Sequence, residues 1–122
     1  MKNKRKLTFR PLKRKDGFSE FEQFYEALPD KDRRKLLLII NHTELDGLQV
    51  AMRQKWVKKL DHNLYELRSK VATNIQRAFY FQDTGSEYLI THGFTKKSQE
   101  TPKREINHAK ALRKQFEEGD LL

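Results

Sequence analysis

The chain has 122 residues, and its 26 Lys and Arg residues against 17 Asp and Glu residues give it a formal charge of +9. This length fits one compact domain with its own core, because domains cluster near ~100–150 residues. The absence of cysteine excludes a disulfide scaffold, a thiolate metal site and a cysteine nucleophile.

The first part of the chain predicts a basic arm, a short strand and two helices. Residues 1–6 are expected to form a disordered arm, followed by a single domain over residues 7–122. Leu7–Phe9 is typical of a strand. A helix is predicted over Phe18–Leu28, because Phe18, Phe21 and Leu28 recur at helical spacing, and Ser19 is a suitable N-cap. Pro29 should end it.

Asp30 is expected to cap the second helix, predicted over Lys31–Leu45, and Asp46-Gly47 to close it. Two helices joined so closely predict an antiparallel helical hairpin. The pattern of Leu48–Lys55 fits either a loop or a short helix.

The rest of the chain predicts four strands and a last helix. The last helix is expected to begin with Thr101 as N-cap and Pro102 in its first turn. Helices on one face of a small antiparallel sheet make an α+β domain. The strands are predicted over residues 56–60, 64–69, 72–82 and 87–94, in addition to the short N-terminal strand.

The positive charge is concentrated near the N-terminus, where residues 1–16 hold eight Lys and Arg residues and one Asp. Such an excess implies a polyanionic partner: nucleic acid, an acidic membrane surface or an acidic protein. The longest apolar run, Leu36–Ile40, is far shorter than the ~20 residues of a membrane span. No apolar segment follows the basic N-terminus, so no secretory signal is predicted. We therefore expect a cytoplasmic protein with no membrane partner.

Several strings of residues resemble those of phage-type HigB toxins, which belong to the RelE/ParE superfamily of type II toxin–antitoxin systems. The most specific string is His92–Pro102, with the pattern His-x-Phe-x-Lys-Lys-x-Gln-x-Thr-Pro. Leu64–Arg68, Arg77–Tyr80, Glu105-Ile106 and Ala109 add to the resemblance, which covers roughly residues 7–118.

The resemblance implies a RelE-like fold, with a small sheet wrapped by helices and a basic concave face. It also implies an mRNA interferase: an endoribonuclease that enters the ribosome, cuts translated mRNA through the RNA's own 2′-OH, and needs no metal or other cofactor. A cognate helix-turn-helix antitoxin of the HigA kind would neutralise it. The ParE branch has the same fold but poisons gyrase, so the fold alone does not determine the activity.

Cleavage by the 2′-OH needs a base, cations around the phosphorane and an acid for the leaving 5′-oxygen. Arg68 is the first candidate for the phosphate, since a guanidinium binds two phosphate oxygens at once. An ion pair with Glu66 is the alternative for this residue. Arg77 is the second candidate, although Ile75 and Phe79 on either side of it favour a place at the edge of the core.

Lys96 and Lys97 lie between the last strand and the last helix, where they could bind phosphate or form a solvated basic loop. His92 could act as acid or base near pH 7, or be structural. Any of four aromatic residues could stack on an unpaired base, although core packing is favoured for each: Trp56, Tyr65, Tyr80 and Phe94. The chain shows no spacing of metal ligands. The candidate RNA-binding residues are Lys58, Lys59, Thr95, Gln99, Thr101 and Lys103.

Two other functions remain compatible with these residues. A ParE-like gyrase poison without nuclease activity would keep its toxicity when Arg68 and Lys97 are lost. A basic nucleic-acid-binding module without catalysis would bind RNA in a salt-sensitive way but would not cut it.

Overall fold

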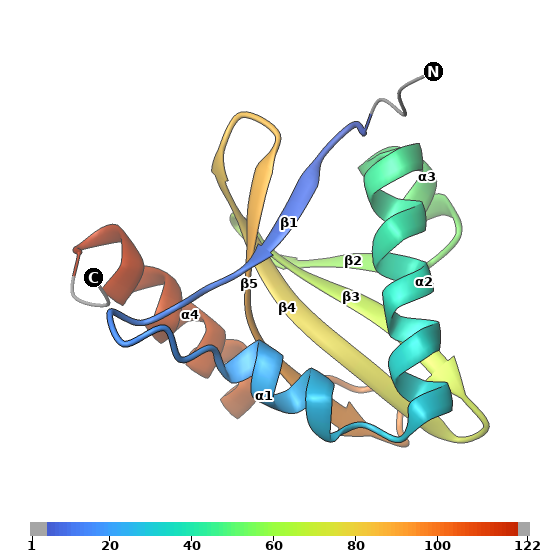
Figure 1. Cartoon of the computed structure of the whole chain (residues 1–122). Helices are drawn as coiled ribbons and strands as arrows, with labels where there is room; N and C mark the ends of the chain where they lie inside the picture. The colour runs from blue at the N-terminus through green and yellow to red at the C-terminus, as the bar shows by residue number, and fades with distance from the viewer. Residues whose placement is uncertain (1–4, 120–122) are drawn as a thin grey trace.

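The computed structural model describes residues 5–119 and forms one five-stranded sheet with helices packed on it (Figure 1). This confirms the predicted α+β class and is consistent with a RelE-like fold. The order of strands across the sheet is β1-β5-β4-β3-β2. The strands are β1 (Thr8–Pro11), β2 (Val57–Asp61), β3 (Leu64–Val71), β4 (Asn74–Thr84) and β5 (Glu87–Lys96). The helices are α1 (Glu20–Ala27), α2 (Asp30–Asp46), α3 (Leu48–Arg53) and α4 (Lys103–Glu117).

The sheet is mixed, whereas the sequence predicted an antiparallel one. Strands β2 to β5 form an antiparallel meander, but β1 lies parallel to β5. A parallel neighbour needs a long crossover, and α1, α2, α3 and the meander all lie between β1 and β5 in the chain. β1 pairs only with Glu87–Ile90, so the second half of β5 has no strand on that side.

The helices cover both faces of the sheet rather than one face. Phe79 and Tyr80, which are neighbours in β4, point to opposite faces because side chains alternate along a strand. Tyr80 belongs to the larger core under α1 and α2, whereas Phe79 packs with Ala109 of α4. The α4 helix therefore forms a second, smaller layer on the other face of the sheet.

The first two helices follow each other directly but pack on different strands, so the expected hairpin opens out (Figure 1). α2 lies on β3 and α1 lies along β5, where Gly93 makes the close approach possible. A Cβ atom at Gly93 would come within 2.1 Å of the Phe24 ring. Any larger residue there would push α1 away from the sheet.

Several expected helix and strand ends differ in the structure. The residues before α2 and α4 are Pro29 and Pro102, and neither Asp30 nor Thr101 provides a side-chain cap. Thr101 binds Glu66 instead. The undecided segment after α2 is the helix α3, and β4 begins at Asn74 because Ala72 adopts a left-handed turn conformation.

Arg5, at the end of the expected basic arm, forms an ion pair with Glu44 of α2. Residues 1–4 of that arm lie outside the described residues. Within the part of the chain that the structure describes, no helix is both long and apolar enough to cross a membrane.

Candidate functional site

The sheet places the two arginines of the sequence motif side by side. Arg68 of β3 and Arg77 of β4 are direct partners in the antiparallel register, so their side chains lie on the same face. Glu66 lies two residues before Arg68 on that face and is fully buried. It forms ion pairs with both Arg68 and Arg77, the latter at 3.4 Å between Nε and Oε1. One buried carboxylate thus balances two guanidinium groups.

Arg68 also connects the sheet to the loop between β5 and α4. Its Nη1 donates to the side-chain oxygen of Gln99 at 3.0 Å, and its Nη2 donates to the hydroxyl of Thr101 at 3.2 Å. Thr101 in turn donates to Glu66. The Arg68 side chain is 17% exposed, so the guanidinium reaches the surface while its position is held from three sides.

Arg77 is fully buried and does not reach the surface. Its guanidinium donates to the carbonyl oxygens of Ile75, at 3.4 Å, and of Lys96, at 3.3 Å, as well as to that of Ser98. Burial lowers the pKa of Arg77; Glu66 opposes this effect, and Arg68 adds to it. The predicted contact with a phosphate would require this residue to leave its buried place. In the structure it holds the end of β5 and positions Glu66.

The predicted lysines are spread around this network. Lys96 is partly exposed at the end of β5, and Lys97 and Lys103 are exposed on either side of the loop. None of the three forms an ion pair within residues 5–119. Lys58 faces Glu66 across β2 and β3, whereas Lys59 is paired with Tyr65 and points to the other face, as its neighbouring position in the strand requires.

Thr95 and Gln99 also lie in different places, as Lys58 and Lys59 do. Thr95 is exposed and pairs with Gln76, whose side chain reaches Asp32 on the α2 side of the sheet. Gln99 stays with Arg68. Of the predicted RNA-binding residues, Gln99 and Thr101 therefore touch the arginine network directly, and Lys58 lies beside it.

A groove of about 360 Å³ opens next to Arg68, between α2, the end of α3 and β3. Three of its lysines were not predicted as site residues. Lys70 had a signal in the sequence, because it follows Arg68 by two positions in a strand. Lys35 and Lys55 had no such signal in the sequence, since only the fold brings α2 and the end of α3 beside β3. The lining residues are Lys35, Ile39, Lys55, Trp56, Arg68, Ser69, Lys70, Ile75 and Gln99.

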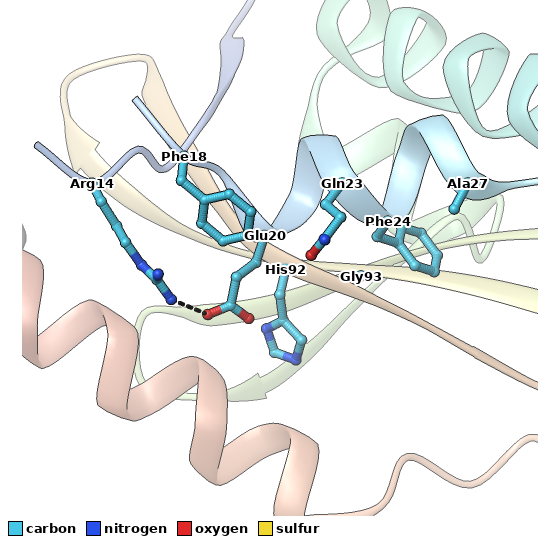
Figure 2. Close-up of a pocket in the computed structure, with 8 residues that line it drawn as sticks. All are labelled: Arg14, Phe18, Glu20, Gln23, Phe24, Ala27, His92 and Gly93. Atoms are coloured by element: carbon cyan, nitrogen blue, oxygen red, sulfur yellow. Dashed lines mark ion pairs between the residues drawn. The ribbon is translucent and has the colours of Figure 1, made fainter. Parts of the chain in front are cut away.

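His92 faces a different depression, of about 670 Å³, at the free edge of β5 (Figure 2). Its Nε2 lies 3.0 Å from Glu105 of α4, and its Nδ1 lies 3.1 Å from the Thr91 hydroxyl. Nε2 donates to Glu105 when it carries the ring proton, and the Thr91 hydroxyl beside Nδ1 also donates to the Phe79 carbonyl at 3.2 Å. Burial lowers the pKa of His92; the hydrogen bond to Glu105 opposes this, and the neighbouring His108 adds to it.

The structure does not bring His92 into the arginine network. Glu66, Phe79 and His92 are registered in one row across β3, β4 and β5, and the Phe79 ring stacks on the His92 ring at 4.7 Å. Two strand spacings, about 10 Å in all, therefore separate His92 from Glu66. In Figure 2 the imidazole lies near Glu20, which forms an ion pair with Arg14 at 3.5 Å.

A comparison with known protein families identifies the family of this chain. The family described as "Phage derived protein Gp49-like (DUF891)" matches residues 23–114, which include the arginine network, the loop and most of α4. The chain belongs to this Gp49-like family. The family is of a RelE- and HigB-like toxin type, so the chain is a phage-derived, toxin-like protein. No curated protein matches the sequence significantly.

Within the described residues, no group of three or more His, Asp or Glu side chains is arranged to hold a metal ion. The two polar networks described above, which belong to this Gp49-like protein, are built on different chemistry. One is organised around two arginines and a carboxylate, and the other around histidines and carboxylates.

Proposed function

We propose that this Gp49-like protein is the toxin of a type II toxin–antitoxin system. In this proposal it is an endoribonuclease that cuts translated mRNA on the ribosome in the cytoplasm, without a metal ion. Membership of a toxin-type family supports the first part of the proposal. The formal charge of +9 supports a polyanionic substrate.

The observation that carries the nuclease proposal is the position of Arg68. Its guanidinium is partly exposed at the groove, where Lys35, Lys55 and Lys70 add three further positive charges. Glu66, Gln99 and Thr101 hold it in a fixed orientation. A pre-oriented guanidinium can stabilise charge that develops on a phosphate at little reorganisation cost.

In the proposed reaction, a base takes the proton of a 2′-hydroxyl as its oxygen attacks the adjacent phosphorus, and the bond from phosphorus to the 5′-oxygen breaks as an acid gives that oxygen a proton. The products are a 2′,3′-cyclic phosphate and a free 5′-hydroxyl, so no water is consumed in this step. Glu66 would keep hold of the Arg68 guanidinium through Nε, while Nη1 and Nη2 exchange their bonds to Gln99 and Thr101 for bonds to the non-bridging oxygens; this exchange is the reorganisation that the step requires. Lys96 and Lys97, on the adjoining loop, would neutralise the phosphate further.

Arg77 and Glu66 act in this proposal as positioning residues. Both are fully buried, and together they fix Arg68 and the carbonyl groups at the end of β5. His92 remains a candidate acid or base from the sequence, but its contacts are with Glu105 and Thr91. The proposed phosphate site does not depend on it.

The proposed partner that silences the toxin is a helix-turn-helix antitoxin. An acidic segment of such a protein would compete with RNA for the same cations, because charge complementarity guides both encounters. Arg68 and the loop lysines would then be covered in the complex and exposed in the free toxin.

The proposal is tested by inducing the chain in bacteria and mapping mRNA 5′ ends by primer extension. We expect cuts within translated frames, and we expect Arg68→Ala and Lys97→Ala to abolish them. Lys114→Ala, which removes an equal charge from the far end of α4, should leave them unchanged. Circular dichroism of each purified variant shows that lost cutting is not lost folding.

Growth arrest with intact mRNA would overturn the nuclease proposal and direct attention to gyrase. Cutting that continues without translation would overturn its ribosome dependence. Cutting by the Arg68→Ala variant would show that the phosphate is bound elsewhere.

A further inference from the structure

The groove beside Arg68 is lined by cations that come from three separate elements. Lys35 belongs to α2, Lys55 follows α3, and Lys70 belongs to β3. All three are exposed, none pairs with a carboxylate in the described part of the chain, and no carboxylate lines the groove. Cations held apart on three elements present several points of contact to an extended polyanion.

The groove also contains an aromatic side chain, Trp56, which is partly exposed. The backbone around it is fixed on both sides: its N–H donates to Ala51 at 2.9 Å, and its carbonyl accepts from Arg68 at 2.7 Å. The indole packs against the core under α2 and lies 5.6 Å from the His42 ring, as favoured from the sequence, and the part of it that stays exposed faces the groove. An aromatic surface among cations is the arrangement on which unpaired bases stack.

A buried and unpartnered polar atom lies in the same lining. Ser69 is 4% exposed and lines the groove, and its hydroxyl has no hydrogen-bond partner among residues 5–119. Buried hydroxyl groups are normally paired. A ligand in the groove would supply the missing partner.

Lys55 has a backbone conformation that a lysine adopts only with strain. Its φ is +64°, and it occupies the position after α3 where the chain turns through N–H bonds from Lys55 to Met52 and from Trp56 to Ala51. Glycine is the usual residue at this position of the turn. Strained residues of this kind gather at ligand sites, and here the strain places an amine beside Trp56.

We propose that this groove binds single-stranded RNA, with one base stacked on Trp56 and the neighbouring phosphates on Lys35, Lys55 and Lys70. The Ser69 hydroxyl bonds to the bound nucleotide, and the strand continues to Arg68 at the end of the groove. This proposal rests on the proposed nuclease function, because it describes how that site holds its substrate. The indole favours RNA over an acidic peptide, which offers charges but no bases.

The experiment uses the fluorescence of Trp56, which is the single tryptophan of the chain. The purified protein is titrated with a short 2′-O-methyl oligoribonucleotide, which cannot be cut by 2′-OH attack. We expect saturable quenching, because a stacked base lies directly against the indole. An abasic strand of equal length and poly-glutamate should quench little and bind more weakly.

Charge-removing variants test the phosphate contacts. Lys55→Gln and Lys70→Gln should each reduce the slope of log affinity against log salt by about 0.7, the value for one phosphate of a single strand. Lys114→Gln removes an equal charge at the end of α4 and should change the slope much less.

Unchanged tryptophan fluorescence at saturating RNA would overturn the proposal, and so would poly-glutamate binding as tightly as RNA with the same quenching. The outcome is separate from that of the mRNA cutting assay. Cut mRNA without quenching would refute the groove alone. Quenching without cut mRNA would refute the nuclease and leave an RNA-binding groove.

Discussion

Two polar networks lie on the face of the sheet that α4 covers, and they differ in the kind of charge they contain. In the first, Glu66 holds two arginines, which stay charged at every physiological pH. In the second, Glu105 holds His92, whose charge depends on pH. Phe79 lies between Glu66 and His92 in the sheet register.

A single sheet face thus separates a permanent charge from a titratable one. The arginine network opens on the lysine-lined groove, where a phosphate needs a cation that is always present. The histidine network joins β5 to α4 and α1 through Glu105, His108 and Glu20. We therefore expect pH to affect the packing of the helices more than the charge of the groove.

The largest expected effect comes from Glu66→Gln. It removes the countercharge of two arginines, one of them fully buried, and breaking a buried ion pair in this way costs about 3–5 kcal/mol. We expect that loss in the free energy of unfolding measured with urea. The cutting of mRNA should fall as well, because Arg68 loses the group that orients it.

Glu105→Gln is the matched control on the other side of Phe79. Its carboxylate is 17% exposed and lies 3.0 Å from Nε2 of His92, a ring whose pKa is lowered by burial. An amide oxygen can accept the same bond from Nε2. We expect a loss below about 1 kcal/mol. Equal losses for the two variants would show that both networks depend on their carboxylate to the same extent.

The fold was predictable from the sequence to the extent that it depends on local patterns. The strands predicted over residues 64–69 and 87–94 correspond to β3 and β5, and the break predicted at Pro29 separates α1 from α2. The parallel pairing of β1 with β5 left no local signal, because it joins Thr8 to Glu87 through the whole length of the meander. The place of α4 on the opposite face depended in the same way on contacts between distant segments.

The site was predictable only in part, for a related reason. The spacing of Glu66 and Arg68 in one strand allowed their ion pair to be foreseen. The groove depends on Lys35, Lys55 and Lys70, which are brought together by three different elements. Strand alternation also placed Arg77 with Phe79, which favoured the buried position that the structure gives it.

The stability of the folded chain should depend on pH through His92. Because burial lowers the pKa of His92 in the folded state, the unfolded chain takes up the proton first as pH falls below about 6.5. The folded state therefore loses stability from that pH down to the lowered pKa, by at most about 1.4 kcal/mol per pH unit from this group. Above pH 7 the contribution is absent.

Urea unfolding of the wild type and of His92→Gln at pH 8 and pH 5 measures this contribution. The wild type should lose more stability than the variant between the two pH values. Glu20, Glu105 and His108 remain in both proteins, so the difference reports His92 together with its coupling to these three groups. A larger loss in the variant would mean that Glu105 stabilises the charged ring more than burial penalises it.

The smallest effect is expected at the groove, from Lys55→Gly. A left-handed conformation costs an ordinary residue about 1–2 kcal/mol, and the greater freedom of glycine in the unfolded chain offsets part of that gain. We expect the free energy of unfolding to rise by about 0.5–1 kcal/mol, while affinity for single-stranded RNA falls. Lys55→Gln keeps the strained conformation and removes the same charge, so it should lose the same affinity without becoming more stable.

If Lys55→Gly bound RNA as well as the wild type, the strain at Lys55 would belong to the turn after α3 and not to the groove. A more stable Lys55→Gly variant that binds RNA less tightly would show that this turn gives up stability to hold a cation beside Trp56.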